Sequence, residues 1–427
     1  MSSFPLKRLI LVFTMAGFSG LTQASGFSLI EQNASGLGNA YAGQAASAQD
    51  ASTVFFNPAG MGLLTDSQLV ATGSLLDSSI TFQNDGSTAA PLQTQGGTGG
   101  DAGGLTFVPS FYYVHPLDDK LVMGLGVNAP FGLKTEYDQS WMGRFQAVTS
   151  DLKTINVNPS LSYKLNDSVL LGVGLSAQYI DATLTNMVNY SALAGGALGA
   201  NLQGLASVKG NDWGWGYNLG ALFTLGDTRV GLAYRSEVDY TLEGDVSFGN
   251  VPPPMAGIPQ LQNGPVTADA TMPASASLSL FHKLNPSIDL LADITWTGWS
   301  TFDVLKVSRT SGSVVSSTTE NWQDSWRYSL GVTWHQNAEW LWRGGVAFDQ
   351  TPVEDAYRTA RIPDNSRTWV ALGGQYRLSE KSALDFGYAY LFVNDGSIDS
   401  TAPGAGTLRG DYDVAVNILS AQYTYTF

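Results

Sequence analysis

Apolar and polar residues alternate with a period of two along most of the chain after the first 66 residues. The alternation is clear in residues 169–179, 213–225 and 326–335. A period of two places successive side chains on opposite faces of a β-strand. These runs have ten residues or more, whereas strands of soluble sandwiches typically have about five or six. The pattern therefore predicts long strands with one face toward lipid and one toward a lumen.

Turn-forming residues interrupt the alternating runs at intervals. Asn, Asp, Pro and Gly favour tight turns, and six short segments rich in them lie at 115–120, 164–168, 225–229, 283–287, 335–339 and 378–382. Seven longer irregular stretches separate the turns, at 84–104, 133–150, 184–211, 249–268, 308–320, 350–367 and 395–409. Outer-membrane barrels have short periplasmic turns and longer outer loops. We therefore expect an all-β fold, a 14-stranded antiparallel transmembrane β-barrel.

Residues 25–66 do not alternate. This segment is rich in Gly, Ala, Ser, Asn and Gln, and between residues 26 and 64 only Glu31 and Asp50 are charged. Apolar side chains recur throughout it, whereas disordered segments are low in apolar residues and rich in charge. We expect residues 25–66 to form a folded N-terminal hatch, or plug, inside a barrel of residues 67–427.

The first 24 residues have the features of a secretory signal peptide. Lys7 and Arg8 precede an apolar run from Leu9 to Leu21, and small residues near Ala24 suit a cleavage site. The apolar run is shorter than the roughly 20 residues that a membrane-spanning helix needs. The mature chain is expected to begin near Ser25 and to leave the cytoplasm.

Composition supports a barrel in the outer membrane of a Gram-negative cell. Of the 427 residues, 13 % are charged, 11 % are aromatic and 48 are Gly. The chain has no cysteine, which excludes disulfide and thiol chemistry. Its formal net charge of −15 argues against nucleic acid as a partner, because nucleic-acid binding depends on Lys and Arg. The chain ends with Tyr423, Tyr425 and Phe427 at alternate positions, which suits the aromatic girdle of a barrel.

Three ordered blocks resemble the FadL/TodX family of channels for hydrophobic compounds. They are Gly26–Gly43 with Asn57-Pro58-Ala59, Gly126–Leu133 with Asn156–Ser160, and Arg343–Val353 with Arg358–Asp364. The resemblance implies a barrel closed by a hatch that carries the Asn-Pro-Ala motif. It also implies that fatty acids are captured at the outer loops, held in an internal pocket, and released sideways through a kink in the third strand.

The third strand by our count is residues 121–132, and it contains Asn128, Ala129, Pro130, Phe131 and Gly132. Proline cannot donate a ladder hydrogen bond and is confined to strand edges, strand starts or bulges. Irregular backbone at membrane depth survives only where it packs on protein or lines a cavity. These five residues are therefore predicted to interrupt the wall next to the plug. The alternative is that Pro130 ends the strand above the membrane.

Candidate ligand-binding residues fall into two groups. Phe27 and Leu29 are expected to form a gate, with ordinary packing of the plug as the alternative, and Asn57, Pro58 and Ala59 to form a structural turn. A carboxylate ligand needs an apolar trough and one cation. Candidate cations on expected loops or inward faces are Arg144, Lys153, Arg235, Arg327, Arg358 and Arg361.

Two outer loops are apolar and suit the capture of hydrophobic molecules. One contains residues 192–205, predicted to form a short helical piece, and the other contains residues 251–261. The alternative is that these loops pack on each other. His115, His282 and His335 lie beside expected periplasmic turns, and no nucleotide-binding, zinc-protease or serine-hydrolase motif is present. We expect no catalytic residue, metal site or cofactor.

The function predicted from the sequence is passive uptake of long-chain fatty acids. The expected partners are a fatty acid or another hydrophobic small molecule, outer-membrane lipid and lipopolysaccharide, with the chain as a monomer. One alternative is a TodX-like channel for aromatic hydrocarbons. A second alternative is a general water-filled porin.

Overall fold

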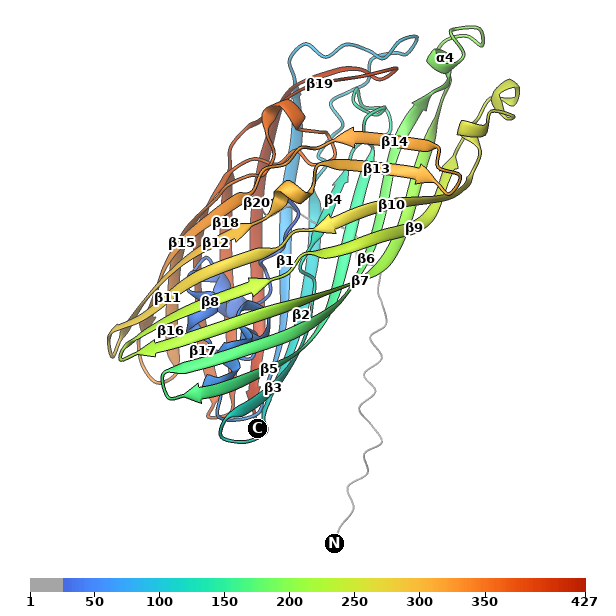
Figure 1. Ribbon diagram of the computed structural model, residues 1–427. Coiled ribbons are helices and arrows are strands. Elements are labelled where there is room, and N and C mark those ends of the chain that lie inside the picture. The colour runs from blue at the N-terminus through green and yellow to red at the C-terminus, as the bar shows by residue number, and fades with distance from the viewer. Residues whose placement is uncertain (1–25) are drawn as a thin grey trace, which may run out of the picture.

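The computed structural model describes residues 26–427. The expected signal peptide and its cleavage site lie outside these residues. The described chain forms a tilted cylinder of antiparallel strands, with long loops at one end and tight turns at the other (Figure 1). Among the described residues, no helix has both the length and the apolar character needed to cross a membrane.

The barrel wall consists of twenty strand segments in one sheet. The segments are β1 (Gln68–Asn84), β2 (Gly104–Pro116), β3 (Leu121–Asn128), β4 (Gly132–Glu136), β5 (Thr149–Asn166), β6 (Val169–Asn189), β7 (Gln203–Leu225), β8 (Thr228–Arg235), β9 (Val238–Phe248), β10 (Gly264–Met272), β11 (Ser275–Asn285), β12 (Ile288–Thr297), β13 (Val304–Arg309), β14 (Val314–Thr319), β15 (Ser325–His335), β16 (Trp340–Asp349), β17 (Arg367–Ser379), β18 (Ser382–Val393), β19 (Gly396–Ala402) and β20 (Gly406–Thr426).

Twelve of these segments combine in pairs into six wall strands, namely β3/β4, β8/β9, β10/β11, β12/β13, β14/β15 and β18/β19, so the wall has fourteen strands. β1 pairs with β20 over its whole length, with Gln68 opposite Thr426, and this pairing closes the cylinder. The predicted 14-stranded antiparallel barrel is confirmed.

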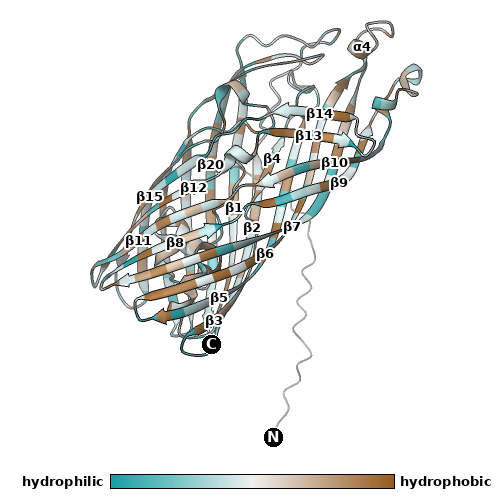
Figure 2. Cartoon of the chain, in the orientation of Figure 1, coloured by the Kyte–Doolittle hydropathy of each residue, from teal (hydrophilic) through white to brown (hydrophobic). Residues whose placement is uncertain are grey.

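Side chains alternate between the two faces of the wall, as the sequence pattern predicts. On β6, Leu171 and Leu175 are 43 % and 62 % exposed, whereas Leu170 is 5 % exposed and faces the interior. Figure 2 shows hydrophobic residues spread along the strands between the two ends of the cylinder. The exposed leucines lie on the outer surface, where an outer-membrane protein contacts lipid.

The plug segment, residues 26–66, lies inside the cylinder in the half nearer the tight turns (Figure 1). It contains α1 (Ala34–Leu37), α2 (Gln44–Ser47), α3 (Thr53–Phe56) and the 3-10 helix η1 (Pro58–Leu63). Asn57 begins η1: its Oδ1 accepts from the Ala59 amide at 3.0 Å, and its Nδ2 donates to the carbonyl of Ala221 in the wall at 3.1 Å. The Asn-Pro-Ala motif therefore both starts a helix and ties it to β7.

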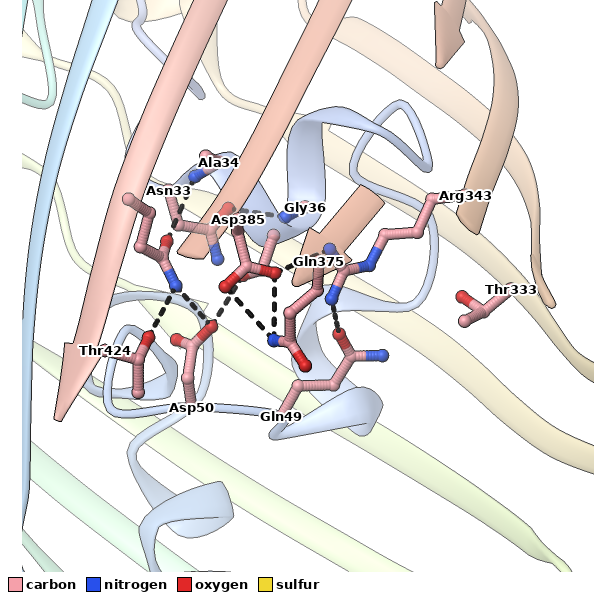
Figure 3. Close-up of polar contacts among 12 residues, drawn as sticks. Asn33, Ala34, Gly36, Gln49, Asp50, Thr333, Arg343, Gln375, Asp385 and Thr424 are labelled. Atoms are coloured by element: carbon pink, nitrogen blue, oxygen red, sulfur yellow. Dashed lines mark hydrogen bonds and ion pairs between the residues drawn. The ribbon is translucent and has the colours of Figure 1, made fainter. Parts of the chain in front are cut away.

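A buried polar network holds the plug segment against the wall (Figure 3). Arg343 Nη1 lies 2.7 Å from Asp385 Oδ1, and Arg343 Nη2 donates to Gln49 Oε1 at 3.0 Å. On the other side of the network, Gln422 Nε2 donates to Asp50 Oδ2 at 2.8 Å. Burial of these groups is tolerated because each bonds to a partner.

Several expected loops are shorter than the sequence suggested. β6 extends to Asn189 and β7 begins at Gln203, so the expected loop 184–211 is wrong by several residues at each end. The helical piece expected from 192 to 205 is also wrong, since α4 covers only Tyr190–Leu193. The expected loops 308–320 and 395–409 contain hairpins, β13–β14 and β19–β20. Cross-strand pairing continues beyond the alternating apolar run, and the sequence pattern alone does not reveal such pairing.

The remaining helices are single turns in loops. They are η2 (Pro253–Met255), η3 (Pro259–Leu261), η4 (Trp299–Thr301) and η5 (Asp355–Tyr357). η2 and η3 belong to the loop between β9 and β10, and η4 connects β12 to β13.

Candidate functional site

The third wall strand is interrupted at residues 129–131. β3 pairs with β5 and with the Phe111–Pro116 part of β2. After the interruption, β4 pairs with β5, and no ladder among the described strands joins β4 to β2. The third strand, expected at residues 121–132, is therefore divided: β3 ends at Asn128 and β4 begins at Gly132.

The first residues of the plug segment fill this interruption from inside. The amide of Leu29 donates to the Pro130 carbonyl at 2.8 Å, and the amide of Gly132 donates to the Phe27 carbonyl at 2.9 Å. The Ala129 carbonyl accepts from Gln32 Nε2 at 2.8 Å. The plug thus provides hydrogen-bond partners for the carbonyl groups of Ala129 and Pro130 and for the amide of Gly132.

Neighbouring side chains on β5 hold the two edges of the break. Asn128 Oδ1 accepts from Asn156 Nδ2 at 3.1 Å, and the Phe131 amide donates to Thr154 Oγ1 at 2.9 Å. Asn128 and Phe131 are 2 % and 6 % exposed, so both face the interior.

Phe27 lies in a cluster of aromatic rings above the break. Its ring centroid is 4.6 Å from that of Trp299, 5.6 Å from those of Phe302 and Trp322, and 6.2 Å from that of Phe131. Most of these pairs are edge-to-face, the favourable geometry for aromatic rings. Trp299, Phe302 and Trp322 were not among the residues expected at the site, because they come from the η4 region and the loop after β14, distant in sequence from Phe27.

A first cavity, the upper chamber, lies between the aromatic cluster and the long loops. Its apolar lining includes Phe27, Leu152, Ile180 and Leu242, and its charged lining includes Glu320 and Arg361. An apolar cavity with a few polar groups is the usual form of a small-molecule site. The upper chamber therefore fits a hydrophobic ligand that has one polar end.

Arg361 and Glu320 determine the charge of the upper chamber. The guanidinium of Arg361 makes only long hydrogen bonds, including 3.3 Å to the Thr149 carbonyl and 3.4 Å to Asn186 Oδ1. Burial lowers the pKa of Arg361 to about 10, against the opposing effect of Glu320. Burial also raises the pKa of Glu320 to about 7, while Arg361 and Trp322 act to lower it. Near neutral pH the chamber therefore holds a cation beside a carboxyl group that is only partly ionised.

A second cavity, the lower chamber, lies beside the break. Leu29, Phe55, Pro130 and Phe131 form one part of its lining. A polar part of the lining includes Asn218, Ser275, Ser277, Thr295, Thr297, Ser325, Asp349, Arg235 and Arg327. Phe27 lines the upper chamber and Ser28 the lower one, so the start of the plug segment separates the two.

The other candidate cations lie elsewhere. Arg144 donates to Gln203, Trp141 and Thr94 at 2.9–3.0 Å and holds loops together. Arg358 is paired with Asp355 and also bonds to the Asp364 carbonyl. The expectation for Lys153 is wrong: it shares the outward face of β5 with the exposed Ile155 and pairs with Asp151 at 3.1 Å.

The two apolar outer loops pack on each other. Tyr190, Met255 and Leu261 are buried in one cluster, against which Val251 and Ile258 pack. Leu193 in the same loop region remains 61 % exposed.

The three histidines lie near the tight turns, each bonded to one side chain. His115 Nδ1 is 2.6 Å from Ser67 Oγ, His282 Nδ1 is 2.9 Å from Thr228 Oγ1, and His335 Nε2 is 2.7 Å from Asp289 Oδ2. Within residues 26–427, no three His, Asp or Glu side chains are grouped so that they could hold a metal ion.

Comparison with known proteins gives a consistent result. Residues 15–427 match the family model described as outer membrane protein transport protein (OMPP1/FadL/TodX). The chain is 29 % identical to the long-chain fatty acid transport protein of Escherichia coli K12, over 94 % of this chain and 96 % of the relative. It is 31 % identical to outer membrane protein P1 of Haemophilus influenzae, over 90 % of this chain and 89 % of the relative.

Solved structures show the same fold. A Pseudomonas aeruginosa FadL homologue superposes with a TM-score of 0.86 at 27 % identity, covering 94 % of this chain and all of the homologue. The Ralstonia pickettii toluene transporter TbuX has a TM-score of 0.68 at 21 % identity, covering 94 % and 99 % of the two chains. The protein is an outer-membrane β-barrel, and it belongs to the OMPP1/FadL/TodX family of transporters of hydrophobic compounds.

Proposed function

We propose that this protein is a passive uptake channel for long-chain fatty acids. The ligand is captured at the apolar outer loops, enters the upper chamber, passes Phe27, and leaves sideways between β2 and β4. The polar lipopolysaccharide headgroups hinder the passage of a hydrophobic solute, and a water-filled pore does not solvate it. An apolar path with a lateral exit avoids both barriers. The channel acts as a monomer and uses no energy source of its own.

One observation carries the choice of a fatty acid: the Arg361 guanidinium lines a mainly apolar chamber together with Phe27. The hydrogen bonds that this guanidinium donates to the surrounding protein are 3.3 Å or longer. A ligand carboxylate can replace them with shorter, charge-assisted bonds. The acyl chain would then contact the leucine and isoleucine side chains of the wall.

The lateral exit is supported by the missing ladder between β4 and β2. The break is bridged by hydrogen bonds from only the first few plug residues, among them Phe27 and Leu29. Movement of those residues would open a path from the lower chamber to the lipid. The rest of the plug need not move, because its anchors at Asp50 and Gln49 are distant in sequence.

A channel for aromatic hydrocarbons is the second candidate, supported by the ring cluster around Phe27. Purification with co-bound lipid followed by mass spectrometry separates the two. A bound acyl chain is expected for the fatty-acid channel. Loss of toluene uptake on deletion of the gene, with no acyl chain bound to the protein, would overturn the fatty-acid proposal.

A general porin is the third candidate. Planar-bilayer recording of the intact protein tests it, because a plug that fills the lumen should block ions. We expect small or rare currents. A large steady conductance would reject the plugged channel.

A further inference from the structure

Arg235 and Arg327 reach the lower chamber without an ion-pair partner among the described residues. Arg235 donates to the Phe55 carbonyl at 2.9 Å and lies 4.5 Å above the Phe55 ring. Arg327 donates to the Ala40 carbonyl at 2.6 Å and is 5 % exposed. Both are therefore held by the plug through neutral groups. Arg327 lies opposite Asp349 across β15 and β16, and Asp349 also lines the chamber, whereas Arg235 bonds only to neutral groups among the described residues.

Hydroxyl side chains form a continuous polar surface between these two arginines. Ser277 is opposite Thr295 and Ser275 is opposite Thr297 across β11 and β12, and Thr297 is opposite Ser325 across β12 and β15. All five side chains line the lower chamber. Hydroxyl groups both donate and accept hydrogen bonds, so this surface can solvate a polar headgroup.

The polar surface lies on the side of the barrel away from the break. Counting around the fourteen-stranded wall, β3/β4 is the third strand and β14/β15 is the tenth, which is half the circumference away. Near the break the lining is apolar, with Leu29, Pro130 and Phe131. The lower chamber therefore has a cationic, hydroxyl-lined side and an apolar side at the exit.

We propose that the lower chamber orients a single-chain anionic amphiphile, with its headgroup on Arg235, Arg327 and the hydroxyl surface and its tail at the break, so that the tail leaves first. This inference rests on the proposed lateral exit. The anionic headgroup forms charge-assisted hydrogen bonds with Arg235, whose contacts are all neutral, and with Arg327 on the same side of the chamber. The tail is drawn toward the break because the lining there is apolar and lipid lies beyond it. A hydrocarbon with no headgroup would take no fixed orientation.

Photo-crosslinking of the purified mature protein tests the orientation. Two palmitic acids would be used, one with a diazirine near the carboxyl group and the other with a diazirine near the terminal methyl group. We expect the tail probe to label residues 129–132 and the head probe to label β11 and β12 near Ser277 and Thr297. The reverse pattern, or equal labelling of both regions by both probes, would overturn the proposal.

Arg235→Gln tests the role of charge, with Arg229→Gln as the matched control. Arg229 lies on the same strand and stacks on Phe281 at 4.1 Å, but it does not line the chamber. We expect Arg235→Gln to reduce head-probe labelling near Thr297 at least fivefold, Arg235→Lys to restore it in part, and Arg229→Gln to leave it unchanged. Equal effects of Arg235→Gln and Arg229→Gln would overturn the proposal.

The outcomes separate this inference from the proposed function. Replacing Asn128–Gly132 should abolish uptake and still leave the head probe on β11 and β12 near Ser277 and Thr297, because Arg235 and the hydroxyl surface are unchanged. If palmitate labels neither chamber of the wild-type protein, both proposals fail. If it labels the lower chamber in the wrong orientation while uptake continues, only the orientation is wrong. Heat-modifiable migration in SDS gels verifies that each variant is folded.

Discussion

The carbonyl oxygen of Phe27 accepts a hydrogen bond from the amide of Gly132 at 2.9 Å, across 105 residues of sequence. In an unbroken wall, a strand residue would bond to a neighbouring strand. Here the plug takes the place of the missing neighbour. The same contact therefore seals the break and fixes the position of the Phe27 ring between the two chambers.

Replacing Asn128–Gly132 by a regular alternating sequence should abolish fatty-acid uptake, because β3 and β4 would then pair continuously with β2. Uptake of radiolabelled palmitate by cells that express the variant measures the effect. Folding should be intact, as judged by heat-modifiable migration. Uptake at the wild-type rate would mean that the ligand leaves by another route.

Deletion of residues 25–50 should increase ion conductance, because it removes α1 and α2 from the lumen. Single-channel recording in planar bilayers measures this change. A barrel that lacks the segment but conducts no better than the intact chain would argue against its role as a plug. The double variant Thr65→Ala/Asp66→Ala, outside the helices, provides a control with unchanged conductance.

Arg361→Gln should weaken binding of palmitate about tenfold or more, since a hydrogen bond to a charged group contributes about 1.5–3 kcal/mol. Binding of a neutral hydrocarbon should change little. Titration calorimetry with the purified protein measures both. Arg409→Gln is the matched control, because Arg409 is exposed at the surface in a loose pair with Asp399. Equal weakening of palmitate and hydrocarbon binding would contradict a carboxylate site at Arg361.

Glu320 should make ligand binding depend on pH. Burial raises its pKa from the ordinary value of 4.5 to about 7, so the folded protein retains a proton that the unfolded chain loses. Its contribution to stability is fully present below about pH 4.5 and is lost as the pH rises toward 7. Above pH 7, the ionised Glu320 competes with the ligand for Arg361.

Binding of a long-chain alkyl sulfonate, which stays ionised, should therefore weaken as the pH rises from 6 to 8. Glu320→Gln should remove this dependence. The measurement is the affinity of the wild-type protein and of Glu320→Gln for the sulfonate at pH 6 and at pH 8. A pH dependence that persists in Glu320→Gln would assign it to another group.

Asp385→Ala should destabilise the protein by about 3–5 kcal/mol, because it leaves the buried Arg343 without its ion-pair partner. Unfolding in urea measures the loss. The double variant Arg343→Met/Asp385→Leu should recover much of the stability, since a hydrophobic pair of similar volume is often tolerated. If Asp385→Ala is as stable as the wild type, the polar network in Figure 3 does not hold the plug.

Local sequence patterns determined the barrel and its strand number. These patterns are the period-two alternation, the tight turns and the N-terminal segment rich in small residues. Each depends on residues that are close in sequence, so it can be recognised without a structure. Pro130 predicts a stop in the ladder of the third strand, because proline cannot donate to it, but the residues alone left open whether the wall is interrupted there or the strand ends above the membrane.

Only the tertiary structure decided which polar groups share a chamber. Arg361 faces Glu320 and Phe27 because loops from distant parts of the chain meet in the lumen. Lys153 points outward, on the same face of β5 as the exposed Ile155. The alternation identifies two faces, but barrel closure decides which of them is inside, and three-dimensional packing decides which charges remain available to a ligand.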